Sequence, residues 1–424
     1  MTYGLIGEKL SHSFSKQIHE RLASYTYHLI SLNKQEFISF MNQRQFKAIN
    51  VTIPYKKEVL PYLDSIDESA QVVGAVNTIV HRNKQLIGYN TDTLGFAYVL
   101  KKYAIQLHGK KVLIIGSGGA CCAIKAVVEK AQPKEIIIVN KTQREGVIDY
   151  ETCYTYHKDV EVIINTSPVG MYPNILSTPI DLTSFPHCKV VMDLIYNPLH
   201  TLLYQQTKRK NLQYINGMEM LIAQAKYAVE IFLQTTIDDK IIDTLYEEIL
   251  HNKLNLVFIG MPGAGKSTIA KALAQHLQKE FIDTDQLIEQ TAQQKIGDIF
   301  AKYGEDHFRE LEKQVCLKVA TMHNKIIATG GGVVKNEDIM NALASNSILL
   351  YLDRDLQLIH LHNEHRPLAQ NKTMLISLYN ERAALYDSFA DYTFQNNESI
   401  EQTVQQIIHT LPHLFKQYRM KNKE

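Results

Sequence analysis

The segment that most constrains this chain is residues 260–268, which read GMPGAGKST. It follows the apolar run LNLVFI and precedes the helical pattern IAKALAQHLQ. A strand, a glycine-rich turn and a helix in this order form a phosphate-binding loop, because the glycines let successive backbone N–H groups point at one anion. Lys266 would then reach the outer phosphates, and the Ser267 hydroxyl would bind Mg²⁺. The alternative is a glycine-rich turn that binds nothing. The loop residues expected at the nucleotide are Gly263, Ala264, Gly265, Lys266, Ser267 and Thr268.

Short apolar runs alternate with helical patterns along nearly the whole chain, which predicts an α/β protein with mostly parallel sheets. Three series of such runs begin near residues 3, 111 and 254. The length of 424 residues also suits about three domains. We therefore expect units at 1–101 together with 215–252, at 102–214 and at 253–424, with a very short joint at residues 251–253.

The composition argues against several classes of protein. A net charge of +1 leaves no long-range basic field, so a general nucleic-acid binder is not expected. No apolar run approaches the length of a membrane span, and the start MTYGLIGEKL lacks a secretory pattern. Five cysteines without metal-type spacing indicate reduced thiols, so we expect a cytoplasmic protein. The oligomeric state is not predicted.

Beyond the phosphate loop, residues 254–394 resemble shikimate kinase. The resemblance rests on the motifs FIDTDQLIE, GEDHFRELE, ATGGGVV, RPLA and ERAALYDSFADYTF. It implies a parallel α/β domain like that of the nucleoside monophosphate kinases, with ATP and Mg²⁺ as cofactors. The implied roles are Asp285 as the base at the accepting hydroxyl, Asp283 in the outer shell of the magnesium, Arg309 and Arg382 at the substrate carboxylate, the backbone of Gly330, Gly331 and Gly332 facing the substrate, and Arg366 over the nucleotide phosphates.

Two arginines suit a small anionic acceptor, since a guanidinium can bind a carboxylate through two parallel hydrogen bonds. Taken singly, Arg309 and Arg382 would be read as surface ion-pair residues. Their joint placement in the motifs favours the binding role.

A second glycine turn, GSGGA at residues 116–120, follows the apolar run KVLII and opens a helical pattern. This context indicates a dinucleotide site. The next apolar run ends in a basic rather than an acidic segment, which suits the 2′-phosphate of NADP, although these cations could also be solvated surface residues. The preference between NADP and NAD stays open. The residues expected at the cofactor are Gly116, Ser117, Gly118, Gly119, Ala120, Asn140, Lys141, Thr142 and Arg144.

Residues 3–224 resemble shikimate dehydrogenase. The motifs are HSFSK, NVTIPYK, GAVNT, GYNTD, NTSPVGM, DLIYNP and NGMEMLIAQA. The resemblance implies an α/β substrate domain and a Rossmann domain that binds NADP(H). The implied roles are Ser13 and Ser15 at the substrate carboxylate, Lys56 and Asp92 in catalysis, Thr52, Asn77, Asp92, Tyr196 and Gln224 around the substrate, and Gly217 near the nicotinamide.

A lysine beside a carboxylate suits ketone reduction. The ammonium stabilises the developing alkoxide and can donate the proton that the oxygen needs, while the carboxylate orients it. Alone, Lys56 would be read as a solvent-facing lysine after a proline turn, but the further motifs in order favour the catalytic role. No His/Cys cluster suggests a metal in this half.

The first half departs from the pattern of the resembled family at four places. Lys16 replaces a proline, Cys122 stands where a basic residue is common, and Arg144 comes one position early. The segment 143–164 is also short, which predicts that the dinucleotide domain lacks part of a strand–helix unit.

The two resemblances point to one metabolite. We expect a bifunctional enzyme that reduces 3-dehydroshikimate with NADPH and then phosphorylates shikimate with MgATP. Two alternatives stay open: a kinase joined to a degenerate dehydrogenase, and a ligand-binding scaffold without turnover. Measured turnover separates them. Quinate activity, channelling and regulation are not predicted.

Overall fold

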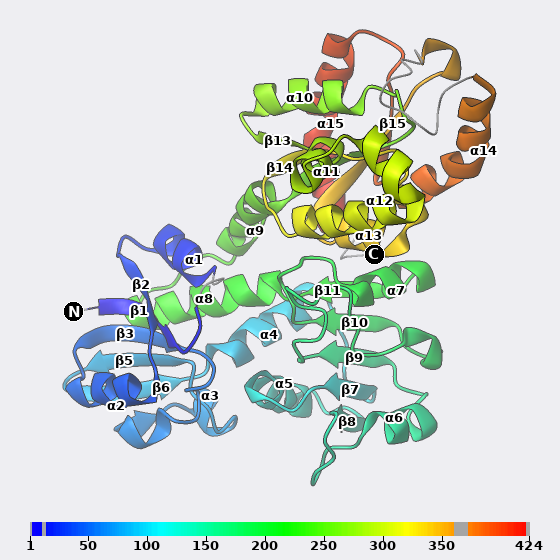
Figure 1. The fold of residues 1–424 in the computed structure, drawn as a ribbon. Coiled ribbons are helices and arrows are strands. Elements are labelled where there is room, and N and C mark those ends of the chain that lie inside the picture. Colours follow the sequence, from blue (N-terminus) through cyan, green and yellow to red (C-terminus); the bar gives the residue numbers. More distant parts are fainter. Residues whose placement is uncertain (1, 11–13, 360–371, 421–424) are drawn as a thin grey trace.

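The computed structural model describes residues 2–10, 14–359 and 372–420. Its strands form three separate sheets (Figure 1). We refer to residues 2–89 as the N-terminal lobe, to residues 111–216 as the middle lobe and to residues 255–420 as the C-terminal lobe. Three long helices outside the sheets connect these lobes. Within the described ranges, no helix combines the length and apolar character that a bilayer crossing requires.

The N-terminal lobe contains a six-stranded mixed sheet. Its elements are β1 (Thr2–Gly7), α1 (Ser15–Leu22), β2 (Tyr27–Ser31), α2 (Lys34–Gln43), β3 (Phe46–Val51), a 3₁₀ turn (Leu60–Tyr62), β4 (Ser65–Ile66), α3 (Glu68–Gln71), β5 (Thr78–Arg82) and β6 (Gln85–Tyr89). The strand order is β2-β1-β3-β5-β6-β4. Strand β1 pairs in parallel with β2 and β3, whereas β5 and β6 form an antiparallel hairpin. Positive φ at Asn83 and Lys84 forms its tight turn. The sequence pattern, which predicted mostly parallel sheets, did not reveal this hairpin.

The middle lobe contains a five-stranded parallel sheet in the order β11-β10-β9-β7-β8. Its elements are β7 (Lys111–Ile115), α5 (Gly119–Lys130), β8 (Glu135–Val139), α6 (Tyr150–Tyr156), β9 (Val162–Asn165), a 3₁₀ turn (Leu182–Ser184), β10 (Val190–Asp193), α7 (Leu202–Lys210) and β11 (Gln213–Asn216). Its buried strands carry near-continuous apolar runs, as parallel strands covered on both faces do.

The edge of the middle-lobe sheet differs from the usual dinucleotide-binding order, 3-2-1-4-5-6. Strands β8, β7, β9, β10 and β11 correspond to 2-1-4-5-6, so no strand of the described residues takes the third place. In its place Ile148 forms one parallel bridge with Val139. The segment 143–164 has room for α6 and the return to β9, but not for another full strand and helix. This agrees with the shortening that the sequence predicted.

The C-terminal lobe contains a second five-stranded parallel sheet, in the order β13-β14-β12-β15-β16. Its elements are β12 (Asn255–Ile259), α10 (Lys266–Leu277), β13 (Glu280–Asp283), α11 (Thr284–Ala292), α12 (Ile296–Ala320), β14 (Lys325–Ala328), a 3₁₀ turn (Val333–Lys335), α13 (Glu337–Ala344), β15 (Ser347–Asp353), a 3₁₀ turn (Leu356–Leu358), α14 (Lys372–Phe389), β16 (Tyr392–Gln395) and α15 (Ile400–Met420). Helix α12 is kinked at Gly304, where φ is +84°.

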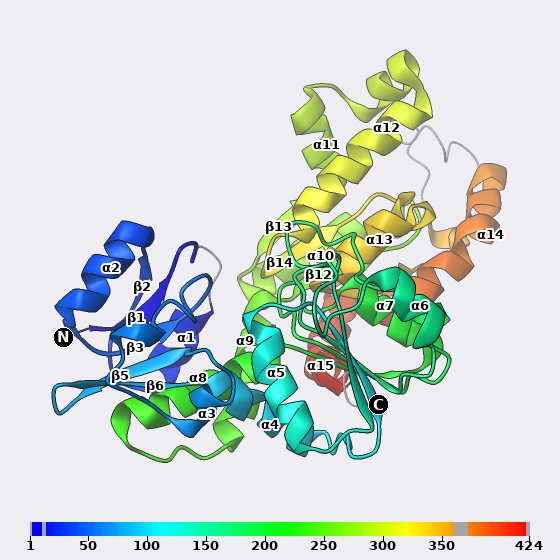
Figure 2. The ribbon, with the colours of Figure 1, turned by 90° about the horizontal axis from the view of Figure 1, so that it is seen from below.

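The connecting helices are α4 (Thr91–Lys102), α8 (Met218–Leu233) and α9 (Lys240–Lys253). Helices α4 and α8 pack side by side between the N-terminal and middle lobes, as both ribbon views show (Figures 1 and 2). Helix α9 then leads into the C-terminal lobe. Leu254 alone separates α9 from β12, and it is fully buried. The short joint expected at residues 251–253 is therefore the last turn of a helix.

One apolar core runs through this joint. It includes Ile222 of α8, Leu245 of α9, Phe258 of β12 and Leu414 of α15, all almost completely buried. Because apolar side chains from both sides of residue 254 belong to this one core, the C-terminal lobe packs onto the helices that support the first half of the chain. The two halves form one body.

An ionic cluster stabilises the same contact. Glu219 of α8, which is 1% exposed, accepts hydrogen bonds from Lys102 (2.8 Å) and Arg419 (3.2 Å). Both cations also pair with Asp243 of α9. Burial opposes the charge of Arg419, but Glu219 and Asp243 outweigh it and raise the pKa of the guanidinium. The cluster thus joins α15 to α4, α8 and α9.

Replacing Arg419 with alanine should weaken this contact. Glu219 would keep Lys102 as its cation, and Tyr246 would lose the guanidinium that lies 5.0 Å from its ring centroid. We expect a loss of about 2 kcal/mol, visible as a lower midpoint of the first thermal unfolding transition.

The matched control is Arg209→Ala. Arg209 of α7 pairs with Glu337 of α13 between the middle and C-terminal lobes, but the two side chains are 64% and 59% exposed. Its loss should stay below about 1 kcal/mol. Equal losses in the two variants would contradict the importance of the buried cluster.

Candidate active sites

Lys56 and Asp92 form the centre of the first site. Lys56 lies in the turn after β3, and Asp92 lies in the first turn of α4, where the partial positive charge of the helix favours a carboxylate. The Nζ–Oδ2 distance is 2.6 Å, and the two side chains are only 18% and 14% exposed. The Asn90 side chain accepts a hydrogen bond from the backbone N–H of Asp92 (3.1 Å) and caps the helix. The pair is thus held by the end of one strand and the start of one helix.

Asn77 and Gln224 meet beside this pair through Thr91. The backbone N–H of Thr91 donates to Asn77 Oδ1 (2.8 Å), and its hydroxyl donates to Gln224 Oε1 (3.3 Å). The sequence interpretation missed Thr91, although it directly precedes Asp92 in the GYNTD motif. The start of α4 therefore organises polar groups from the residue before β5, from α4 itself and from α8.

Lys56 also faces the glycine turn of the middle lobe. A Cβ built on Gly119 would lie 3.9 Å from the Lys56 side-chain Cδ. A lysine of the N-terminal lobe therefore lies close to the turn that opens α5 in the middle lobe, although the two are far apart in the sequence. This proximity is what a reaction between a substrate and a dinucleotide requires.

The expected cofactor residues are arranged around Ser117. Asn140 Nδ2 donates to the Ser117 hydroxyl (2.7 Å), and an Arg144 NH donates to the Ser117 carbonyl (2.7 Å). Lys141 and Thr142 are exposed beside them. This donor set, a glycine turn at a helix start flanked by two cations, fits an anionic dinucleotide. Gly118, Gly119 and Ala120 form the helix start itself.

Tyr196 and Gly217 lie at the strand ends β10 and β11. A Cβ on Gly217 would lie 2.0 Å from the Leu194 carbonyl oxygen, so only glycine allows α8 to start against that loop. Thr52 and Ser15 are half-buried on the N-terminal lobe, at the end of β3 and the start of α1. Ser13 lies outside the described residues.

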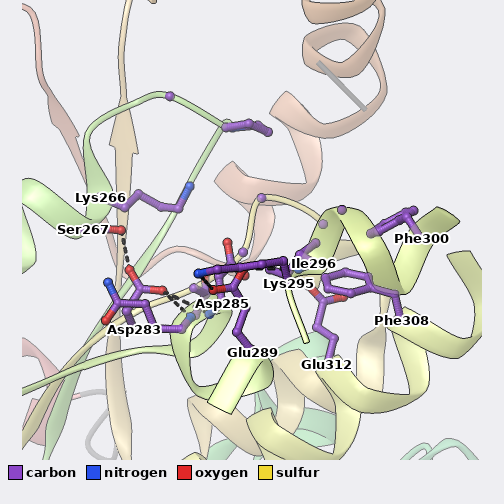
Figure 3. Close-up of a pocket in the computed structure, with 18 of the residues that line it drawn as sticks. Lys266, Ser267, Asp283, Asp285, Glu289, Lys295, Ile296, Phe300, Phe308 and Glu312 are labelled. Atoms are coloured by element: carbon purple, nitrogen blue, oxygen red, sulfur yellow. Dashed lines mark hydrogen bonds and ion pairs between the residues drawn. The ribbon is translucent and has the colours of Figure 1, made fainter. Parts of the chain in front are cut away.

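The second site is a cavity of about 540 Å³ in the C-terminal lobe (Figure 3). The phosphate loop forms one wall. Gly265 has φ +93°, and a Cβ there would lie 2.7 Å from Asn396 Nδ2, so the loop requires glycine. Lys266 Nζ donates to the carbonyl oxygens of Gly260 (2.9 Å) and Met261 (3.0 Å). The remaining loop residues, Gly263, Ala264, Ser267 and Thr268, lie between β12 and the first turn of α10.

Ser267 and Asp283 face each other at the edge of this cavity, with Oγ–Oδ2 2.6 Å (Figure 3). A hydroxyl and a carboxylate at a phosphate loop fit Mg²⁺, which keeps several waters and shares its oxygen ligands with nucleotide phosphates. The described residues contain no cluster of three or more His, Cys, Asp or Glu side chains suited to a metal.

Asp285 is buried deeper in the same cavity. Its Oδ1 has no hydrogen-bond partner among the described residues. Burial, followed by the nearby negative charge of Asp283, raises the pKa of Asp285 to about 6. A carboxylate with a free oxygen and a raised pKa suits a group that accepts a proton from a substrate.

Two arginines complete the cavity wall. Arg309 donates to Glu305 (2.8 Å) and to Glu312 (2.7 Å), which fixes its guanidinium. Arg382 is 3% exposed and donates to the Gly331 carbonyl oxygen (3.1 Å). The structure thus brings the two arginines to one cavity with Asp285. Arg366 lies outside the described residues.

Glu312 is a site residue that the sequence interpretation missed. It is 1% exposed, and it holds Arg309 from the next turn of α12. The spacing of three residues between Arg309 and Glu312, typical of a helical ion pair, was an available signal. Lys295 and Phe308 also line the cavity and were not predicted.

The fold and the two sites define an oxidoreductase-type body joined to a phosphate-loop kinase, and comparisons with known proteins agree. The family model of shikimate kinase matches residues 262–412, and that of the shikimate dehydrogenase substrate binding domain matches residues 5–79. The chain belongs to the shikimate dehydrogenase family and carries a shikimate kinase domain after the dehydrogenase part.

Individual relatives match the first half of the chain. Shikimate dehydrogenase (NADP(+)) of Clostridium beijerinckii is 35% identical over 260 residues, which cover 58% of this chain and 96% of the relative. Two solved structures are similar to the first half. Shikimate dehydrogenase 1 from Peptoclostridium difficile has 34% sequence identity and a TM-score of 0.54, and the match covers 59% of this chain and 98% of that one. A chorismate mutase/shikimate 5-dehydrogenase fusion protein from Clostridium acetobutylicum has 33% identity and a TM-score of 0.56, and the match covers 58% of this chain and 96% of that one.

The raised pKa of Asp285 predicts that this carboxylate lowers the stability of the fold while it is needed for kinase activity. The pKa in the folded protein lies above the ordinary value of 3.8, so the ionised carboxylate destabilises the fold. This penalty is absent below about pH 4, grows up to about pH 6 and is complete above it. Asp285→Asn should therefore raise the free energy of unfolding by about 1–3 kcal/mol at pH 8 and by less at pH 5, while kinase kcat falls at least about 100-fold.

Thermal unfolding at the two pH values measures this effect. Asp387→Asn is the control, because Asp387 is an exposed carboxylate of α14, and it should change neither stability nor its pH dependence. An Asp285→Asn protein that is less stable than the parent at pH 8 would disprove the assignment of a buried, costly charge.

Proposed function

We propose that both halves of this bifunctional shikimate-pathway protein turn over, and that the first makes the substrate of the second. The first half reduces 3-dehydroshikimate to shikimate with NADPH, and the second phosphorylates shikimate at its 3-hydroxyl with MgATP. The observation that carries the proposal for the first half is the Lys56–Asp92 pair at 2.6 Å, whose lysine side chain lies beside a glycine turn. The relatives named above support the substrate and NADP.

In the first site, Lys56 binds the keto oxygen and donates a proton to it as the alkoxide forms, which is general acid catalysis. Asp92 keeps the ammonium oriented, and its position at the start of α4 keeps it rigid. Asn77, Gln224, Thr52 and Tyr196 orient the ring hydroxyls, and Ser13 and Ser15 bind the carboxylate. These roles extend the resemblance residue by residue.

In the second site, Asp285 accepts the proton of the 3-hydroxyl. Arg309 and Arg382 bind the shikimate carboxylate, and Glu312 orients Arg309. Lys266 and Arg366 neutralise phosphate charge, while Ser267 and Asp283 hold the magnesium shell. Phosphoryl transfer needs mainly positioning and charge neutralisation, which this cavity offers.

The cofactors supply what the side chains cannot: NADPH a hydride and MgATP a phosphoryl group. The residues proposed to hold NADPH are those around Ser117, together with Gly217. The first-half basic residues Lys141 and Arg144 favour NADP over NAD. All five cysteines are unpaired thiols, which supports a cytoplasmic location.

Two alternatives predict different kinetics. A degenerate first half would leave ADP formation from added shikimate without NADPH oxidation. A scaffold would bind ligands without turnover of either kind. Following NADPH consumption and ADP release in one tube, from 3-dehydroshikimate and ATP, separates these cases. Turnover of neither ring compound would overturn the proposal.

Lys56→Met should lower the kcat of NADPH oxidation by about 100- to 10,000-fold, because the variant lacks the proton donor. ADP formation from added shikimate should stay within about twofold of the parent, since Lys56 lies in another lobe. Two separate spectrophotometric assays measure this. Loss of both activities would refute independent chemistry in the two sites.

Lys266→Ala should give the opposite pattern. Kinase kcat should fall by about 100-fold or more, because the cation at the phosphate loop is lost. NADPH oxidation should stay at the parental rate. A variant that keeps its kinase activity would remove Lys266 from its proposed role.

A further inference from the structure

Lys253, the last residue of α9, is buried where the two halves join. It is 2% exposed, and its Nζ donates to the Tyr196 carbonyl oxygen (2.9 Å) and to Asn197 Oδ1 (3.0 Å). Among the described residues no carboxylate contributes to its pKa, which burial lowers to about 7. A buried ammonium without a counter-ion is costly to the fold. Its contacts therefore point to a role beyond packing.

The same ammonium contacts the N-terminal lobe. Its Nζ lies 4.9 Å from the ring centroid of Phe14, a cation–π distance. The Phe14 ring meets the Tyr196 ring edge to face, with centroids 6.0 Å apart. Phe14 stands between Ser13 and Ser15 in the sequence. Lys253 thus touches segments from two lobes that carry proposed substrate contacts.

The C-terminal lobe forms hydrogen bonds to Lys253 and to the segment that contains Tyr196. The backbone N–H of Asn324 donates to the Lys253 carbonyl oxygen (3.2 Å). Asn346 Oδ1 accepts from the Leu199 backbone N–H (3.0 Å), and the Ser345 carbonyl oxygen accepts from His200 (3.0 Å). The segment 196–200 therefore rests on residues of the kinase domain.

We propose that Lys253 is a positioning residue of the dehydrogenase reaction, which fixes the Tyr196 and Phe14 segments from the joint with the kinase domain. The proposal rests on the proposed function of the first half. Lys253 does not contact Lys56 or Asp92 in the described hydrogen bonds, so its loss should loosen the pocket without removing the proton donor. A looser pocket binds the substrate less tightly in the ground state and in the transition state alike. The variant should therefore have a higher KM and an unchanged kcat.

The test compares Lys253→Met, Lys253→Arg and Lys240→Met. Lys240 begins the same helix and is exposed, so its variant controls for the substitution. In Lys253→Met we expect KM for 3-dehydroshikimate to rise about tenfold, with kcat within about threefold. Lys253→Arg, which keeps charge and donors, should restore at least part of that KM. Lys240→Met should match the parent, and the kinase constants of all three should stay within about twofold.

Each result decides the question. A parental KM in Lys253→Met, or equal loss of kinase and dehydrogenase activity, would overturn the positioning role and leave a structural one. If Lys253→Met does not fold, Lys253→Gln replaces it, and the proposal then requires the same result, a raised KM with a nearly unchanged kcat. If the parent itself does not reduce 3-dehydroshikimate, the proposed function of the first half fails instead.

Discussion

The structure depends on the apolar core that passes without interruption from α8 and α9 into the C-terminal sheet. Leu254 is the one residue between the last helix of the first half and the first strand of the second, and it is fully buried. A linker that is buried on all sides cannot act as a flexible tether. The kinase lobe is therefore fixed relative to α8, the helix that also carries Gln224 of the first site. The placement of the kinase lobe against the first half therefore follows from packing, not from linker length.

Local patterns predicted the parts of the protein that are local in the chain. The phosphate loop, the glycine turn and the motifs of Lys56 and Asp92 each combine a strand end with a following turn or helix, so a short stretch of sequence contains all the information. The short segment 143–164 likewise predicted the reduced middle-lobe sheet, because the crossover length sets how many elements fit.

The missed features are long-range or ambiguous. Glu219 meets Arg419, two hundred residues away, and no pattern along the chain relates them. The sequence predicted only that Lys253 belongs to a short joint after a helix. Tyr196 and Phe14 come to lie around it only in the folded chain. The β5–β6 hairpin was missed because its turn, Asn83-Lys84, lacks the glycine that usually signals such turns.

The reduced edge of the middle lobe raises the question of what replaces the lost strand. In a full dinucleotide fold the third strand would flank β8 and support the loop that follows it. Here that loop is supported by the glycine turn that follows β7 and by one bridge to β8. Asn140 binds the Ser117 hydroxyl, Arg144 binds the Ser117 carbonyl, and Ile148 adds a single backbone bridge to β8. Arg144, which comes one position early in the sequence, thus lies where its guanidinium reaches the glycine turn. A cofactor with a 2′-phosphate would then meet Arg144, which a hydrogen bond to the glycine turn, rather than a neighbouring strand, holds in place.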